Sequence, residues 1–261
     1  MAPQTTPLTV RVQARGGKFL ADDIGGATIS IRDVRSGDVL ASGVTRGTSG
    51  SLKTTDELEP GDLARASLCV VRTPGDPETI RWLIADSDSS KFVADLEIEG
   101  PTQVEVVSYG SLGGLQSAQQ VTATTWLAPG AAGPTEPGFV LEIPGLVVQV
   151  QQPATHSALA AVPTTVPLEV NVAMMCGCPI DDGEPWIPDD FRVTAAVGVV
   201  GGQSLETVPL AFDQSAGIAG RFTGCYRVTT PGFYEAQFVA EQVSTGNTGS
   251  GLVTFFFESS S

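Results

Sequence analysis

KFVADLEIEG, residues 91–100, is the stretch that decides the fold class. Its apolar side chains occupy every second position, and most positions between them are charged: Phe92, Ala94, Leu96 and Ile98 alternate with Lys91, Asp95, Glu97 and Glu99. A period of two is that of a β-strand with one face buried and one face in water. Gly100-Pro101 then ends the pattern. The stretch therefore predicts a half-buried strand.

The same alternation continues on both sides of this strand. Before this strand, the alternation predicts strands at 8–14 and 29–31. After it, and up to residue 150, strands are predicted at 104–106, 119–127 and 138–150, the last interrupted by Pro144-Gly145. Further strands are predicted at 168–174, 191–197, 208–212, 222–228, 234–240 and 251–258. No segment has helical periodicity, and turn formers are abundant, with 30 glycines and 18 prolines. Both observations predict an all-β protein.

The chain of 261 residues is long enough for two ordinary domains. Residues 151–166, QQPATHSALAAVPTTV, lack both periodicity and charge, as a linker would. We therefore predict an N-terminal β-sandwich at 1–150, with a long polar, glycine-rich loop at 46–66, and a second domain at 167–261. Six or seven strands in about a hundred residues is typical of an immunoglobulin-like sandwich. The expected architecture is two antiparallel β-sandwich domains in tandem, the second immunoglobulin-like.

Two segments resemble known families. GGATISIRDVRSGDVLASGVTRG, residues 25–47, resembles the strand-turn-strand hairpin of carboxypeptidase-regulatory or transthyretin-like sandwich domains. PGFYEAQFVAEQVSTGNTG, residues 231–249, resembles the last hairpin of bacterial immunoglobulin-like domains. Both resemblances imply a role in binding, spacing or assembly, and neither provides catalytic residues.

The charge of the chain limits its partners and its location. A net charge of −15 excludes nucleic acid and anionic membrane surfaces as partners, because binding to phosphates needs clustered cations. No apolar run has the length of a membrane span. The start, MAPQTTPLTV, lacks the regions of a signal peptide. A strand-rich chain with few lysines and with cysteines available for pairing nevertheless predicts an extracytoplasmic protein that is periplasmic, secreted or at the cell surface.

Catalytic residues are scarce. The only histidine, His156, lies in the expected linker, and the sequence has no nucleophile elbow, zinc-protease, phosphate-loop or dinucleotide motif. A pair of carboxylates is all that a glycoside hydrolase needs, so this activity is kept as the third hypothesis, together with a carbohydrate-binding module. Trp82, Trp126 and Trp186 could form a sugar platform, but their positions beside strand patterns or turns favour a core residue or a hydrophobic plug. We therefore expect a protein that is not an enzyme.

An acidic loop is the candidate site for calcium. The loop PIDDGEPWIPDD contains five carboxylates at Asp181, Asp182, Glu184, Asp189 and Asp190. Closely spaced oxygen ligands on a loop suit Ca²⁺, although the spacing is not that of an EF-hand. The alternative is a solvated acidic turn in which Trp186 packs inward.

MMCGCPI, residues 174–180, has two interpretations. Met174, Met175, Cys176 and Cys178 are soft ligands that suit copper. Alternatively the stretch is a disulfide corner. Extending the preceding alternation places Cys176 inward and Met175 outward, which makes convergence on one metal ion poor. Because cysteines one residue apart rarely bond to each other, we predict a bridge from Cys178 to Cys225, with Cys176 free or paired with Cys69.

The run Phe255-Phe256-Phe257 is the candidate interface. Consecutive strand residues point to opposite faces, so one face of the run packs on the core. The other face must be covered by the first domain, a partner chain or an edge contact. The leading hypothesis is therefore a non-catalytic exported protein for binding, accessory functions or surface assembly, which contacts another protein or itself. A copper-binding protein is the alternative, and no other cofactor is expected apart from calcium.

Overall fold

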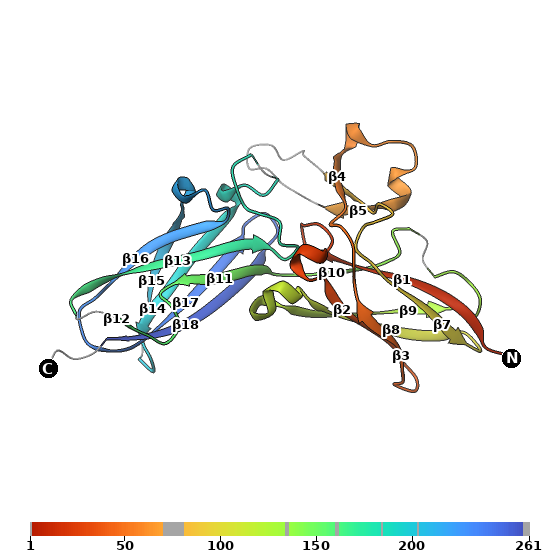
Figure 1. Ribbon diagram of the computed structural model, residues 1–261, viewed down its shortest axis with the longest axis horizontal. Coiled ribbons are helices and arrows are strands. Elements are labelled where there is room, and N and C mark those ends of the chain that lie inside the picture. The colour runs from red at the N-terminus through yellow and green to blue at the C-terminus, as the bar shows by residue number, and fades with distance from the viewer. Residues whose placement is uncertain are drawn as a thin grey trace. The chain divides into compact units, whose positions relative to one another are not determined.

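The computed structural model describes residues 2–69, 81–133, 136–159, 162–183, 185–202 and 204–257. Within these ranges the chain divides into two compact units (Figure 1). The first unit runs to Gly145 and includes the short segment Met175–Cys178, and the second contains Leu146–Met174 and the residues from Pro179 onward. All helices in the described residues are short 3-10 turns, so the all-β fold class is confirmed.

The first unit is a sandwich of two sheets with a third, smaller sheet attached. One sheet has the strand order β10 (Phe139–Ile143), β1 (Gln4–Ala14) and β7 (Phe92–Ile98). The facing sheet has the order β3 (Val39–Val44), β2 (Ala27–Asp33), β8 (Thr102–Gly110) and β9 (Gln119–Leu127). The core contains the inward side chains of both sheets, including Leu8, Val10, Leu96, Ile29, Ile31 and Val106. The strand that decided the fold class, β7, has the alternating burial expected of it.

The segment 46–66, expected to be a long loop, is instead structured. It contains β4 (Ser51–Thr54) and the 3-10 turns η2 (Thr55–Glu57) and η3 (Asp62–Arg65). The third sheet has the order β4, β6 (Arg81–Ile84) and β5 (Ala66–Cys69). The buried Asp62 carboxylate holds the segment by accepting hydrogen bonds from Lys53 Nζ at 2.9 Å, Arg65 at 2.7 Å and the Glu59 N–H at 2.9 Å. Polar contacts of this kind leave no period in the sequence, which is why alternation did not predict the segment.

A buried arginine is central to the first unit. The Arg11 side chain on β1 is 0% exposed. Its guanidinium donates to the carbonyl oxygens of Ser89, Ser90 and Pro137 and to the Glu136 carboxylate at 3.0 Å, and it lies 5.5 Å from the centre of the Phe19 ring. Arg11 therefore fastens β1 to two loops that are remote in sequence.

The second unit is one continuous set of eight paired strands that folds over on itself. The order is β11 (Leu146–Gln152), β13 (Thr164–Met174), β16 (Arg221–Val228), β15 (Glu206–Phe212), β14 (Phe191–Val199), β17 (Gly232–Gln242), β18 (Asn247–Phe257) and β12 (Ser157–Leu159). Strand β15 connects the two layers, because its first part pairs with β14 and its last two residues, Ala211 and Phe212, pair with β16. This gives the expected sandwich, with a core that includes Leu168, Val170, Val193, Phe222 and Phe238.

Residues 151–166, expected to link the domains, carry strand in their described part. They include the end of β11, the whole of β12 and the start of β13. Strand β12 pairs in parallel with β18, Ser157 opposite Phe255 and Leu159 opposite Phe257. Backbone pairing at a sheet edge needs no apolar period, so composition alone suggested a linker. The domain limits at 1–150 and 167–261 stay a prediction.

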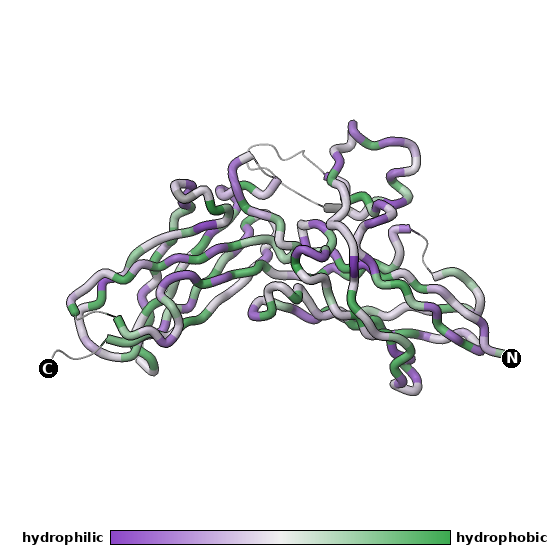
Figure 2. The backbone as a smooth tube through the Cα atoms, in the orientation of Figure 1, coloured by the Kyte–Doolittle hydropathy of each residue, from purple (hydrophilic) through white to green (hydrophobic). Residues whose placement is uncertain are grey.

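Most of the predicted strands match observed ones. Strand β9 has the predicted limits, and β10 and β11 are separated at Pro144-Gly145. Figure 2 shows apolar and polar positions mixed along the strands of both units. Both segments that resemble known families form antiparallel hairpins, β2–β3 and β17–β18. The antiparallel pattern has two exceptions among the described strands, the parallel pairs β1–β10 and β12–β18.

Candidate functional site

The outer face of β17 and β18 carries the candidate interface. Phe255 and Phe257 are buried at 1% and 3% exposure, whereas Phe256 faces outward and is half-buried. Phe256 lies opposite Phe233, which is 65% exposed, and the two ring centres are 5.5 Å apart. We call Phe233 and Phe256 the aromatic pair. Leu252, 61% exposed, lies further along β18 on the same face.

The inner side of the same hairpin explains why the run of three phenylalanines has two roles. Tyr234 stacks on Phe255 with ring centres 5.8 Å apart and meets Phe257 edge-on at 5.9 Å. The Tyr234 hydroxyl donates to the Thr230 carbonyl oxygen at 2.9 Å. The inner rings are therefore fixed by packing and by a hydrogen bond, and the aromatic pair is left on the surface.

The cysteine corner lies in the first unit, where β13 has ended. Met175 is 0% exposed, so the expectation that it points outward is wrong; alternation no longer applies beyond the last strand residue, Met174, which is also buried. Cys176 is 1% exposed, and its sulfur accepts a hydrogen bond from the Lys18 N–H at 3.5 Å. Cys178 is half-buried.

The two thiols of this corner titrate as a pair. The hydrogen bond to Cys176, with burial, raises the pKa of Cys178 far above its ordinary value. Burial also raises the pKa of Cys176, but the hydrogen bonds from Cys178 and from the Lys18 N–H outweigh burial and lower it overall.

The structure contains no disulfide at the cysteines whose side chains it describes. Cys176, Cys178 and Cys225 are all free thiols. Cys225 is exposed on β16, on the outward face that we expected, and the expected bridge from Cys178 to Cys225 is not formed. The Cys69 side chain, proposed as a partner of Cys176, lies outside the described residues. Cysteine pairing therefore no longer supports the prediction that the protein is exported, and this prediction is now based on composition alone.

The acidic loop does not gather its carboxylates. Among the described side chains, no three His, Cys, Asp or Glu residues are placed to hold a metal ion. Asp190 is 5% exposed and accepts hydrogen bonds from Gln242 at 3.0 Å and from the Ser244 N–H at 2.9 Å. Asp181 accepts from the Asp182 N–H, and Asp182 in turn accepts from Gln214. Asp189 is exposed, and Glu184 lies outside the described residues.

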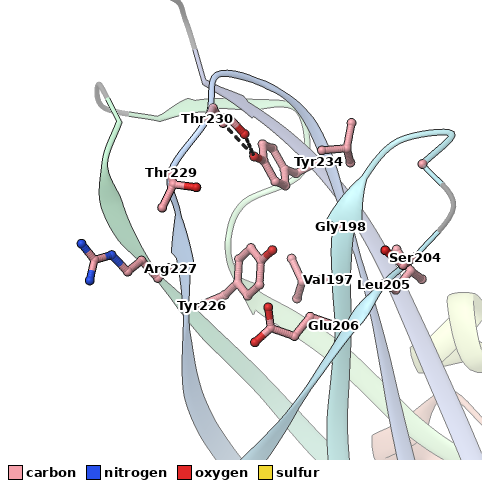
Figure 3. A pocket seen from close by; sticks show the side chains of 12 residues that line it. Val197, Gly198, Ser204, Leu205, Glu206, Tyr226, Arg227, Thr229, Thr230 and Tyr234 are labelled. Atoms are coloured by element: carbon pink, nitrogen blue, oxygen red, sulfur yellow. Dashed lines mark hydrogen bonds between the residues drawn. The ribbon is translucent and has the colours of Figure 1, made fainter.

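An open pocket of about 440 Å³ lies at one end of the second unit. Figure 3 shows the Glu206 carboxylate turned toward the Tyr226 ring, while Arg227 points away. Burial and the charge of Glu206 raise the pKa of Tyr226. The volume suits a small ligand, but Glu206 is the single carboxylate of the residues that line the pocket. A glycoside hydrolase needs two, so this pocket does not provide that chemistry.

The three tryptophans occupy different environments. Trp186 is 3% exposed and packs inward as expected, and Trp82 is partly buried and donates to Thr55 at 3.2 Å. Trp126 on β9 is 66% exposed, so the expectation that it is a core residue or a plug is wrong. It borders a hollow of about 270 Å³ together with Asp33, Arg35 and Gln103.

His156 has no catalytic neighbours among the residues described. It is exposed, and its Nδ1 lies 3.1 Å from the Thr254 hydroxyl. Its backbone has a φ of 53°, in the left-handed region. Its role is that of a surface turn residue at the start of β12.

The comparisons with known proteins show no family. No family model and no curated protein matches the chain. Among solved structures, it is similar to an engineered protein at 21% identity, over 46% of this chain and 22% of that one, with a TM-score of 0.32. The chain therefore spans less than a quarter of that protein.

Two other solved structures are similar over nearly the whole chain. The fibronectin(III)-like modules of Clostridium thermocellum CbhA are 10% identical over 96% of this chain and 90% of theirs, with a TM-score of 0.28. The chicken interferon gamma receptor alpha chain is 11% identical over 98% of both chains, with a TM-score of 0.33. At these scores the similarities carry no functional argument. In the described residues there is no helix long and apolar enough to cross a membrane.

Sequence reasoning missed some of the residues at these sites. Phe233 precedes the alternating series that starts at Tyr234, so it is out of phase with the core and should have been read as an exposed aromatic. The contact between Lys18 and Cys176 joins residues 158 positions apart, and no local pattern predicts it.

Proposed function

We propose that the protein is a non-catalytic exported binding, accessory or surface-assembly protein that contacts another protein or a second copy of itself. The observation that carries the proposal is the aromatic pair, two phenylalanine rings on the outer face of a hairpin whose inner phenylalanines, Phe255 and Phe257, are already buried. Two adjacent aromatic rings are costly to leave in water and are enriched at protein interfaces.

The position of the aromatic pair supports a contact through the face of the sheet. Strand β12 covers the edge of β18 from Phe255 to Phe257, so strand addition at that part of the edge is blocked. The outer face beside it stays open, with Phe233 65% exposed. A partner would therefore pack on the rings and would not extend the sheet.

Site-specific photo-crosslinking tests this proposal. We expect a photoreactive phenylalanine at position 233 to give one defined adduct in the cells that produce the protein. An adduct of twice the chain mass identifies a second copy, and another mass identifies a different protein. The matched control is position 93, because Val93 is 53% exposed on the outer face of β7 in the other unit. The proposal would be contradicted if position 233 gave no adduct, or if positions 233 and 93 gave adducts in equal amounts.

A carbohydrate-binding role is the second candidate, and Trp126 favours it. An exposed indole beside polar side chains is suited to stacking on a sugar ring, and Trp126 borders a hollow with Asp33 and Gln103. We expect wild-type protein to be retained by an insoluble polysaccharide and Trp126→Ala to be released. Trp82→Ala is the control for loss of an indole that is not fully exposed. If no polysaccharide in a broad panel retains the wild type, this candidate fails.

A further inference from the structure

We propose that the pocket at one end of the second unit binds an alkylammonium cation, which contacts the Glu206 carboxylate and the Tyr226 ring. The site is distinct from the aromatic pair, because neither Phe233 nor Phe256 is among the residues that line the pocket. It therefore adds a small-ligand site to the surface contact proposed above and does not depend on that contact.

The pocket arises where strand β15 separates from strand β16. Over the described length of both strands, they pair with each other only at the last two residues of β15. At the start of β15, Glu206 pairs instead with Val197 on β14, in the other layer of the sandwich. The start of β15 and the end of β16 therefore diverge, and Glu206 and Tyr226 line the pocket from these two strands (Figure 3).

Glu206 places a carboxylate on the inward side of its strand. It shares a face with Val208 and with Leu210, which is 7% exposed, because alternate side chains of a strand point to the same side. A carboxylate in phase with core residues needs water or a partner, and here the pocket leaves it exposed to solvent. Among the described residues, this carboxylate has no hydrogen bond and no ion pair. The pocket therefore presents an uncompensated negative charge to a ligand.

Tyr226 provides an aromatic face beside this charge. Its ring is half-buried, and its centre lies 6.5 Å from the centre of the Tyr234 ring. Tyr234 is 3% exposed, and its hydroxyl donates to the Thr230 carbonyl oxygen at 2.9 Å, so it supports the Tyr226 ring from inside the sandwich. The face of an aromatic ring attracts a cation that lies within about 6 Å of its centre. Because the Glu206 carboxylate is turned toward this ring (Figure 3), one cation can contact both groups.

Apolar side chains also line the pocket. Val197 is 0% exposed, and Leu205 is half-buried. The Ser204 and Leu205 segment packs closely over Gly198, where a β-carbon would lie 2.8 Å from the Ser204 carbonyl oxygen and from Cδ2 of Leu205. Apolar side chains next to a carboxylate suit a ligand that has both an alkyl body and a charged nitrogen.

The charge of the pocket selects the class of ligand. The Arg227 side chain points away from it (Figure 3), so an anion would meet the Glu206 carboxylate without a cation to hold it. A single carboxylate is also too few for calcium, which takes about six to eight oxygen ligands. The net charge of −15 attracts cations to the protein as a whole. With a volume of about 440 Å³, the pocket has room for a small organic cation.

An NMR titration of the chain with three small molecules tests the site. Choline represents a free quaternary amine, N-acetyl-lysine methylamide represents a lysine side chain of a partner protein, and dimethylbutanol has the shape of choline without its charge. We expect saturable binding of at least one of the two cations, with a Kd in the millimolar range. Dimethylbutanol should bind at least about 10-fold more weakly than choline, because it lacks the charge that the carboxylate and the ring attract. Whichever cation binds more tightly identifies the source of the ammonium group.

Substitutions assign the binding to the two contacting groups. Glu206→Gln should weaken the affinity for the cation by about 5-fold, as expected for loss of an exposed ion pair. Tyr226→Leu should weaken it by about 5-fold through loss of the aromatic face, whereas Tyr226→Phe keeps that face and should change it by less than about 2-fold. Because Glu206 is exposed, its variant should keep the wild-type circular dichroism spectrum.

Glu235 provides the matched control. It is half-buried on β17 in the same unit and does not line the pocket. Glu235→Gln removes the same charge and should leave the affinity for the cation unchanged. The proposal is overturned if neither cation binds, if dimethylbutanol binds as tightly as choline, or if Glu206→Gln and Tyr226→Leu both keep the wild-type affinity. It is also overturned if Glu235→Gln weakens binding as much as Glu206→Gln does.

Discussion

Arg11 in the first unit and Phe233 in the second both lie out of phase with the core residues of their strands, on the outer face of a sheet. The Arg11 side chain is nevertheless covered by loops of its own unit and is 0% exposed. Phe233 places an aromatic ring outside its sandwich, at 65% exposure. The difference lies in their surroundings. Arg11 has hydrogen-bond acceptors in two loops of its own unit, whereas Phe233 shares its surface with Phe256 and solvent.

This comparison separates residues that stabilise the fold from residues that bind a partner. A buried charge is tolerated only where its own chain satisfies it, so Arg11 is explained by stability. An exposed pair of aromatic rings gains little stability from its own chain, so Phe233 and Phe256 are explained by an interaction. The following predictions test this division.

The largest effect is expected at Arg11. Arg11→Ala removes the guanidinium and leaves the Ser89, Ser90 and Pro137 carbonyl oxygens without their donor. The free energy of unfolding of the first unit should fall by more than about 5 kcal/mol, because each acceptor left without its donor costs about 1–3 kcal/mol and the packing of the side chain is lost as well. Urea unfolding measures this.

Arg15 is the control for that substitution. Its side chain is 45% exposed and pairs with Glu142 at 2.9 Å. Arg15→Ala should cost less than about 1 kcal/mol, as exposed ion pairs do. If both substitutions lowered the free energy of unfolding equally, Arg11 would not be the residue that holds β1 to the two loops.

Within the second unit, neighbouring phenylalanines should behave differently. Phe255→Ala removes a ring that is 1% exposed and should lower the free energy of unfolding by about 3–5 kcal/mol. Phe256→Ala, one residue further, should cost less than about 1 kcal/mol because its ring faces outward. Thermal unfolding of the two variants measures the two losses of stability. A large loss at Phe256 would make the outer ring part of the core.

The smallest effect is expected at Asp62 and depends on pH. Hydrogen bonds from the Glu59 N–H and from Lys53 lower the pKa of Asp62 below its ordinary value of 3.8. Its contribution to stability is therefore complete above that value and is lost as the pH falls through the lower folded-state pKa. Asp62→Asn should be less stable than wild type at neutral pH. The gap between the two melting temperatures should narrow in acid, and a gap that stays constant would contradict the assignment.

The sequence predicted the strands well because burial leaves a visible period. The alternation at Phe92–Ile98 and the break at Pro144-Gly145 both appear in the structure. Segments held by polar contacts or by backbone pairing were missed, as at Asp62 and at Ser157–Leu159. The outward turn of Phe256 follows from alternation once the strand is placed, but its pairing with Phe233 required the register of β17 and β18. The meeting of Cys176 with Lys18 depends on tertiary folding.

The most direct test of the account is the mass of the complex that the protein forms in the cells that produce it. Light scattering after gentle isolation should give the wild type a mass above that of the monomer. The double variant Phe233→Ser and Phe256→Ser should have the monomer mass and an unchanged melting temperature, and Val93→Ser should keep the complex. A double variant that retains the wild-type complex would contradict the claim that the aromatic pair is the contact surface.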